Sequence, residues 1–198
     1  IEQKGIDISW GNTAFVYDGT EKFPEYIVGG IIDGDVVQMT HTGGATNAGY
    51  GYNGAISGIV GEDAGNYKLP SNSNQNFSIL KADQSAPAGI GKTDETVSKK
   101  ADGTITGVDA TMEYRIEGEN NYSAIAGSAI ENLAAGKYYV RIKGDSNHNA
   151  SPDTAVTIAA GRKFKITLPK NTVGYTVTTT AEEADYGGTF NVTLTVHE

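Results

Sequence analysis

The chain has 198 residues, which is enough for one large domain or two small ones. Its 24 acidic residues outnumber its 15 basic residues, and the formal net charge of -9 argues against a general affinity for nucleic-acid phosphates. No apolar run approaches the ~20 residues of a membrane-spanning helix. The absence of cysteine excludes disulfides, thiolate metal sites and cysteine nucleophiles.

Apolar and polar residues alternate in several segments, beginning near the N-terminus with Ile6, Ile8 and Trp10. Because successive side chains of a strand point to opposite faces, this alternation predicts half-buried strands. The same pattern recurs at residues 112–116, 138–142, 164–168 and 190–196. The last of these segments is the most regular and is predicted to be the best-defined strand of the chain.

Turn-forming pairs separate these segments, and they include Asp18-Gly19, Asp33-Gly34, Asn53-Gly54, Asp102-Gly103 and Gly187-Gly188. No segment keeps a helical apolar period for three turns, although residues 123–135 could hold a single helical turn. Short strands separated by turns predict an all-β fold built from antiparallel sandwich modules.

Composition predicts two joints in the chain. Residues 83–93 are small and polar, as in an exposed connector, and residues 159–162 separate two alternating segments. We therefore predict β modules at 1–82 and 83–160, followed by a segment at 161–198 that is too short to be stable alone. This segment either packs on the preceding module or begins a third one. We expect the latter, because the chain stops at the end of a strand.

The first segment resembles the YDG-type repeat, which is related to the MBG modules of bacterial surface proteins. The resemblance covers about residues 5–82 and rests on four motifs in order: Tyr17-Asp18-Gly19, Gly34-Asp35, Asn47-Ala48-Gly49 and the segment from Gly61 to Tyr67. It implies a small all-β module of a secreted or wall-attached multidomain protein.

The second segment is similar to Ig-like and fibronectin type III-like modules, through residues 113–115 and the segment LAAGKYYVRI at 133–142. The resemblance implies a corner in which a tyrosine hydroxyl bonds back to the main chain. Tyr138 shares its face with Val140, but Tyr139 is the alternative for the corner. Residues 174–196 look like the opening of another Ig-like repeat.

Candidate catalytic groups are few, because the three histidines, His41, His148 and His197, lie outside any recognisable motif. A nucleophile and base could be drawn from His148 with Ser146 or Ser151 and Asp153. We interpret this segment instead as a solvated loop, and predict no catalytic residues and no enzyme activity.

Acidic pairs are candidates for calcium ligands at Asp33 with Asp35, at Glu62 with Asp63, and at Asp102 with Asp109. None reproduces a calcium-loop pattern, so turn formation is the favoured interpretation, and no metal or other cofactor is predicted. A Lys-Asn amide cross-link, known in surface domains that resemble this class, would require buried partners such as Lys81 and Asn66 beside Glu25. Surface exposure of all three is expected.

Aromatic residues are candidates for glycan contacts. Tyr50 and Tyr52 share a face of their predicted strand, with Trp10 elsewhere, and we expect the pair to lie in the core. Tyr139 is predicted to be an isolated exposed side chain.

Together these features predict a non-catalytic stalk, spacer or adhesive segment of an extracellular, cell-surface or cell-wall protein. Its expected partners are neighbouring repeat modules of the same chain, without nucleic acid or membrane insertion. The alternative is a module that binds a host glycan or glycoprotein directly.

Overall fold

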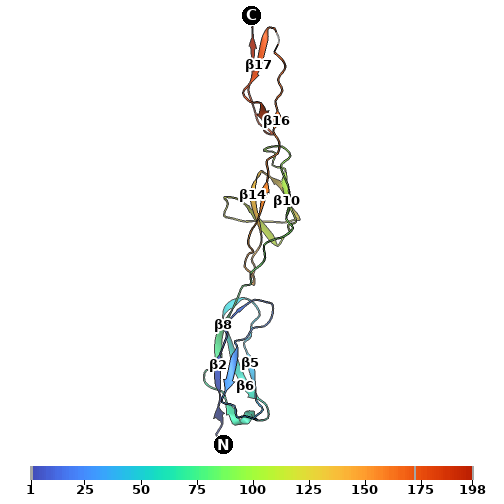
Figure 1. Cartoon of the computed structure of the whole chain (residues 1–198). Helices are drawn as coiled ribbons and strands as arrows, with labels where there is room; N and C mark the ends of the chain where they lie inside the picture. The colour runs from blue at the N-terminus through green and yellow to red at the C-terminus, as the bar shows by residue number, and fades with distance from the viewer. Residues whose placement is uncertain (1, 172, 198) are drawn as a thin grey trace. The chain divides into compact units, whose positions relative to one another are not determined.

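The computed structural model describes residues 2–171 and 173–197, and within them it confirms the predicted all-β class (Figure 1). The described residues contain one short helical element, the 3-10 turn η1 (Ala64–Asn66). No helix in this described part is long and apolar enough to cross a membrane. Backbone contacts divide the chain into two compact units: unit 1 comprises residues 1–84 with 144–150, and unit 2 comprises residues 85–143 with 151–198. The module boundaries at 82 and 160 stay predictions.

Unit 1 contains a four-stranded sheet in the order β3-β8-β6-β5, in which only the β3 and β8 pair is parallel. Two smaller sheets pair β2 with β4 and β1 with β7. The strands are β1 (Lys4–Gly5), β2 (Asp7–Trp10), β3 (Ala14–Val16), β4 (Tyr26–Gly29), β5 (Gln38–Thr42), β6 (Gly49–Val60), β7 (Tyr67–Lys68) and β8 (Asn74–Leu80).

The core of unit 1 follows the alternation read from the sequence. Ile6 and Ile8 are buried around β2, and Phe77 and Ile79 are buried at alternate positions of β8. The pair Asn53-Gly54 was wrongly predicted to form a turn, since both residues lie inside β6. Gly54 is buried against Pro24, and a Cβ atom on it would lie 2.7 Å from Cδ of Pro24, so only glycine lets the two segments approach this closely.

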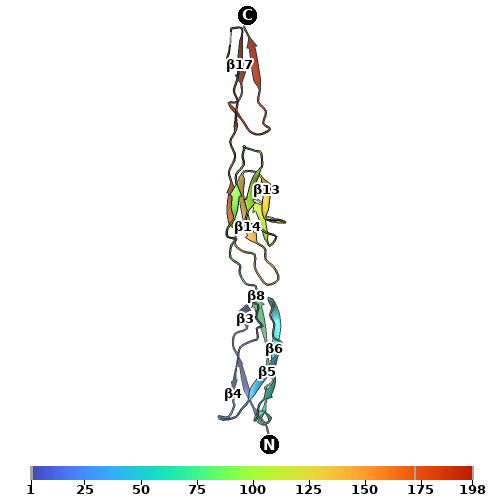
Figure 2. The same ribbon diagram turned by 90° about the vertical axis from the view of Figure 1, so that its right-hand side faces the viewer.

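Unit 2 contains a β-sandwich, meaning strands β9 to β15 between residues 85 and 158, and Figure 2 shows its strands β13 and β14. One sheet has the order β13-β10-β9 and the other β12-β11-β14-β15, with all pairs antiparallel. The strands are β9 (Gly91–Thr93), β10 (Gly103–Thr106), β11 (Met112–Ile116), β12 (Ser123–Ala124), β13 (Ala129–Leu133), β14 (Gly136–Ile142) and β15 (Thr154–Ile158).

Side chains from both sheets of the sandwich meet in one apolar core. Ile105, Val140 and Ile158 are almost completely buried, and Tyr138 is buried beside them. The hydroxyl of Tyr138 donates a 2.9 Å hydrogen bond to the carbonyl of Ala134, so Tyr138 and not Tyr139 occupies the corner. The helical turn considered for residues 123–135 is wrong, because strands β12 and β13 occupy this segment.

The C-terminal segment, residues 161–171 and 173–197, forms two small antiparallel sheets of unit 2, each of two strands that are not consecutive in the chain. They pair β16 (Phe164–Lys165) with β18 (Glu183–Ala184), and β17 (Tyr175–Thr179) with β19 (Val192–Val196). The alternation at 164–168 therefore produces only a two-residue strand. The most regular alternation of the sequence does form β19, but every residue of this strand is exposed.

Candidate binding site

Tyr50 lies at a β-bulge that turns its ring into solvent. The pairing of β6 with β8 shifts register between Gly49 and Tyr52, and Gly51 between them has a φ of 74°. This left-handed conformation favours glycine. Tyr52 packs against Phe77, with ring centroids 5.4 Å apart, whereas the side chain of Tyr50 is 80% exposed. The prediction that both tyrosines share a core face is therefore wrong.

A cavity of about 510 Å³ lies beside Tyr50 within unit 1. Val16 and Leu80 contribute exposed apolar side chains to its wall. The polar part of the lining includes Asp83 and Asn149, and the amide Nδ2 of Asn149 donates a 2.8 Å hydrogen bond to the carboxylate of Asp83. The cavity thus combines an aromatic ring, apolar flanks and paired hydrogen-bonding groups, which is the usual composition of a small-ligand site.

Loop residues 144–150 of unit 1 carry the polar side of this cavity. The main-chain amide of Ala82 donates to the carbonyl of Asn147, and the carbonyl of Ala82 accepts from the amide of Asn149; each hydrogen bond is 2.9 Å long. The side chain of Asn147 accepts a 2.9 Å bond from the amide of Ala48. These contacts hold the loop on the strands that flank the cavity.

His148 lies in the same loop and contacts Asp145, with Nδ1 3.0 Å from both carboxylate oxygens. The ring of Tyr17 packs edge-on against His148, with centroids 5.1 Å apart. The amide of Asn147, followed by the side chain of His148, lowers the pKa of Asp145 below its ordinary value. This carboxylate therefore serves to order the loop.

The serines considered as nucleophiles have other environments. Ser151 is buried, and its hydroxyl accepts from the amide of Ile142 and donates to the carbonyl of Pro152. Asp153 binds Tyr122 and Arg115, and Ser146 lies on the lining of the cavity. His41 stacks on Phe23, and His197 contacts the hydroxyl of Thr176. The prediction that no catalytic set exists stays a prediction.

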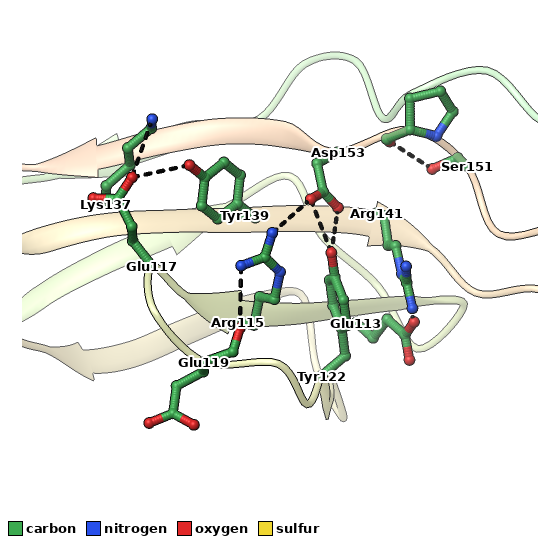
Figure 3. Close-up of polar contacts among 11 residues, drawn as sticks. Glu113, Arg115, Glu117, Glu119, Tyr122, Lys137, Tyr139, Arg141, Ser151 and Asp153 are labelled. Carbon is green, nitrogen blue, oxygen red and sulfur yellow. Dashed lines mark hydrogen bonds and ion pairs between the residues drawn. The ribbon is translucent and has the colours of Figure 1, made fainter.

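A second cluster of polar and aromatic side chains lies on the outer face of β11 and β14 in unit 2, and we call it the Arg-Tyr face (Figure 3). The guanidinium of Arg115 lies 4.3 Å from the ring centroid of Tyr139 and 5.3 Å from that of Tyr122. The guanidinium of Arg141 also lies over the ring of Tyr122, 3.6 Å from its centroid. The ammonium of Lys137 lies 5.1 Å from the ring centroid of Tyr139. Tyr139 is half-buried and its ring contacts the cations of Arg115 and Lys137, so the prediction of an isolated exposed side chain is wrong.

The charges of the Arg-Tyr face are paired with one another. Arg141 forms an ion pair with Glu113 at a distance of 2.8 Å, and Arg115 forms one with Asp153 at 3.2 Å. The ammonium of Lys137 lies 3.4 Å from the carboxylate of Glu117. The hydroxyl of Tyr139, followed by Lys137, lowers the pKa of Glu117, while contacts with Tyr139 and Glu117 raise the pKa of Lys137. These shifts keep both groups of the pair ionised. The alternation of β14 could have placed Tyr139 and Arg141 on one face, but the position of Tyr122 depends on the loop before β12.

Four of the six acidic residues considered as calcium ligands accept hydrogen bonds from the rest of the chain. Asp35 accepts from the hydroxyl of Tyr67, and Asp63 accepts from the amide of Val36. Asp102 binds Thr96, and Asp109 binds Thr111. Within residues 2–171 and 173–197, no group of three or more acidic or histidine side chains is placed to hold a metal ion. The bond between Thr111 and Asp109 is that of a turn-forming carboxylate, whereas Tyr67 and Val36 lie 32 and 27 positions from the carboxylates that accept their bonds.

The residues considered for an amide cross-link are all exposed, as expected: Glu25, Asn66 and Lys81 lie at the surface. The ammonium of Lys81 donates to the carbonyl of Asp145.

A different ion pair, which the sequence did not reveal, joins Lys99 to Asp185 in unit 2 at a distance of 2.7 Å. Their contact raises the pKa of Lys99 and lowers that of Asp185. Both groups are thus held in their charged forms, whereas amide formation requires the neutral amine and the neutral acid.

Trp10 is also satisfied within unit 1. Its indole N–H donates a 3.1 Å hydrogen bond to the carbonyl of Asn72, and its ring contacts Phe23 and Tyr26 at centroid distances of 6.2 and 6.0 Å. Of the aromatic residues considered for glycan contacts, Tyr50 is therefore the one whose ring faces solvent beside a cavity.

Comparison with known proteins finds no family model that matches the chain and no matching curated protein.

Proposed function

We propose that the chain is a non-catalytic structural and adhesive segment of a bacterial cell-surface or secreted multidomain protein, in which small β modules act as a stalk or spacer. The observation that carries the proposal is the sandwich of unit 2, with its closed apolar core and the bond from Tyr138 to Ala134. Sandwiches with a tyrosine corner recur among extracellular and cell-surface domains. The resemblance of the two segments to YDG/MBG, Ig-like and fibronectin type III-like repeats supports the same conclusion.

The Arg-Tyr face supports a spacer in a second way. Its cations and carboxylates neutralise one another on the sheet face, so the exposed layer of the sandwich presents few unpaired charges to other molecules. The net charge of -9 adds a general repulsion between copies of the chain. A spacer benefits from both properties, because its modules have to remain apart at high surface density.

Labelling of intact cells tests this proposal. An antibody raised against the purified chain should label intact cells of the organism that produces it, or should detect the protein in the culture medium. Brief trypsin treatment of intact cells should remove the surface signal, while a cytoplasmic marker stays protected. A signal that appears only after lysis would contradict the proposal.

The cavity beside Tyr50 favours a second candidate function, direct binding of a host glycan or glycoprotein. An exposed aromatic ring next to fixed polar groups is typical of a recognition site. The purified chain should then bind saturably to a glycan array. A pure spacer would show no saturable binding, so this measurement separates the two functions.

A further inference from the structure

We propose that the cavity beside Tyr50 binds the pyranose ring of a neutral sugar; this inference rests on the second candidate function. The lining of the cavity is partly apolar and partly polar. Tyr50 shares it with the apolar side chains of Val16 and Leu80, while Asp83 and Asn149 contribute hydrogen-bonding groups. A pyranose has the matching character, since its C–H groups form an apolar face and its hydroxyls project from the edge.

The exposed ring of Tyr50 supplies the stacking surface. The backbone on both sides of the ring is fixed, because Gly49 pairs with Ile79 of β8 and Gly51 has the left-handed conformation that forms the bulge. A tyrosine ring offers a large contact area at the cost of only two side-chain torsions. A bound ligand therefore has to order only these two torsions of Tyr50.

The pair of Asp83 and Asn149 supplies hydroxyl recognition. Their 2.8 Å bond uses one amide proton and one lone pair, whereas an amide and a carboxylate can each make several hydrogen bonds. The remaining amide oxygen and carboxylate oxygen present acceptors to neighbouring hydroxyl groups. The main-chain amide of Asn149 donates a 2.9 Å hydrogen bond to the carbonyl of Ala82, and its carbonyl accepts a 2.7 Å bond from the side chain of Gln84. The backbone that carries this amide side chain is therefore held in place before a ligand binds.

The charged groups of the lining balance one another, which suits a neutral sugar. Asp83 places a carboxylate at the cavity and Lys81 an ammonium, which donates to the carbonyl of Asp145. An anionic sugar would be attracted by Lys81 but repelled by Asp83, the carboxylate that is paired with Asn149. Methyl glycosides of glucose, galactose, mannose and N-acetylglucosamine are suitable neutral probes, with glucuronate as the acidic counterpart.

Nitrogen-15 NMR of the full chain during titration with each probe tests the proposal. At least one neutral glycoside should produce saturable shifts at the amides of Gly49, Gly51 and Asn149, at millimolar concentration. Glucuronate should bind no more tightly than the best neutral glycoside. Cyclohexanol, which has the ring size without neighbouring hydroxyls, and a short extended peptide such as acetyl-Val-Thr-Val-amide should produce no saturable shift at these amides.

Variants assign the binding to named groups. Tyr50→Ala should weaken binding at least tenfold and Asp83→Ala severalfold, while Tyr50→Phe should keep it within about twofold because the ring stays in place. Tyr186→Ala removes another exposed tyrosine, in unit 2, and should leave binding unchanged. Since Tyr50 is exposed, its variants should fold normally, and the NMR spectrum of each free variant verifies this.

Three results would overturn the inference: no saturable shift with any neutral glycoside, equal shifts with cyclohexanol or the peptide, or full binding by Tyr50→Ala. The glycan array distinguishes this failure from that of the wider proposal. Array binding that survives in Tyr50→Ala would leave the adhesive function standing and place its site elsewhere. No array binding at all would remove the adhesive function and leave the spacer.

Discussion

The sandwich and the C-terminal segment of unit 2 both show clear apolar alternation, yet they differ completely in burial. In the sandwich, Ile105 and Val140 have no exposed surface. In β19 of the C-terminal segment, Val192, Leu194 and Val196 are 53%, 60% and 71% exposed. The difference arises because the sandwich has two sheets facing each other, whereas β17 and β19 form a single two-stranded layer.

The two-stranded sheet of β17 and β19 has one threonine-rich face and one apolar face. Threonines pair across its strands, Thr176 with Thr195 and Thr178 with Thr193, while the apolar residues pair with one another, as Val177 does with Leu194. Cross-strand pairing and alternation therefore organise a strand without burying it. The contribution of an apolar side chain to stability depends on the layer that covers it.

The largest expected effect compares core positions of the two regions. Ile105→Ala should lower the free energy of unfolding of the sandwich by about 2–5 kcal/mol, because it opens a cavity in a closed core. Leu194→Ala should change it by about 0.5 kcal/mol or less. Urea denaturation followed through the NMR signals of β14 measures both. Equal losses in the two variants would contradict the comparison.

The next effect concerns the loop before β10. Buried Glu95 accepts hydrogen bonds from the amides of Lys99 and Ala101, two non-glycine residues with φ values of 65° and 55°. Glu95→Ala should cost about 2–3 kcal/mol, because both amides lose a charged acceptor. Glu119→Ala, at an exposed carboxylate, is the matched control. The same denaturation experiment applies, and an unchanged midpoint for Glu95→Ala would show that the loop is held by other contacts.

A smaller effect is expected at the corner of the sandwich. Tyr138→Phe keeps the buried ring and removes only the bond to the carbonyl of Ala134, so it should cost about 1 kcal/mol. Tyr114→Phe is a suitable control, because the ring of Tyr114 also packs against the core. Thermal unfolding of the two variants provides the measurement. A larger loss in Tyr114→Phe would contradict the role given to the corner.

The smallest effect is a pH dependence of the loop that precedes β10. The hydroxyl and amide of Thr96, with Lys100, lower the pKa of Asp102 from 3.8 to about 2. The folded-state pKa lies below the unfolded value, so this stabilisation is present above pH 4 and is lost as the pH falls from about 4 to 2. Denaturation midpoints across this range should fall more steeply for the parent chain than for Asp102→Asn. Parallel curves would show that Asp102 contributes nothing to the acid response.

Several parts of the fold could be predicted from the sequence. The alternation around Ile8, Tyr138 and Val140 predicted both the strands and their buried faces correctly, because each of these strands is covered by another layer. The same reasoning correctly placed a strand at Val192–Val196 but wrongly predicted that it is half-buried. Asn53-Gly54 was misassigned because Gly54 is required by the close approach of Pro24 and not by a turn.

The candidate site was only partly predictable. The sequence singled out Tyr50 but placed it in the core with Tyr52, since regular alternation assigns both to one face. Tyr50 is exposed because the left-handed conformation of Gly51 interrupts that alternation. The polar side of the cavity depends on contacts such as that between Ala48 and Asn147, which are 99 positions apart in the chain.

By itself, the sequence determined the all-β class and the faces of a few strands such as β2 and β14, because alternation and turn chemistry act between near neighbours along the chain. Only the tertiary structure decided which apolar faces are covered, which tyrosine occupies the corner, and which polar groups adjoin Tyr50. Each of these depends on segments that pack together from distant positions, and such packing leaves no local pattern in the sequence.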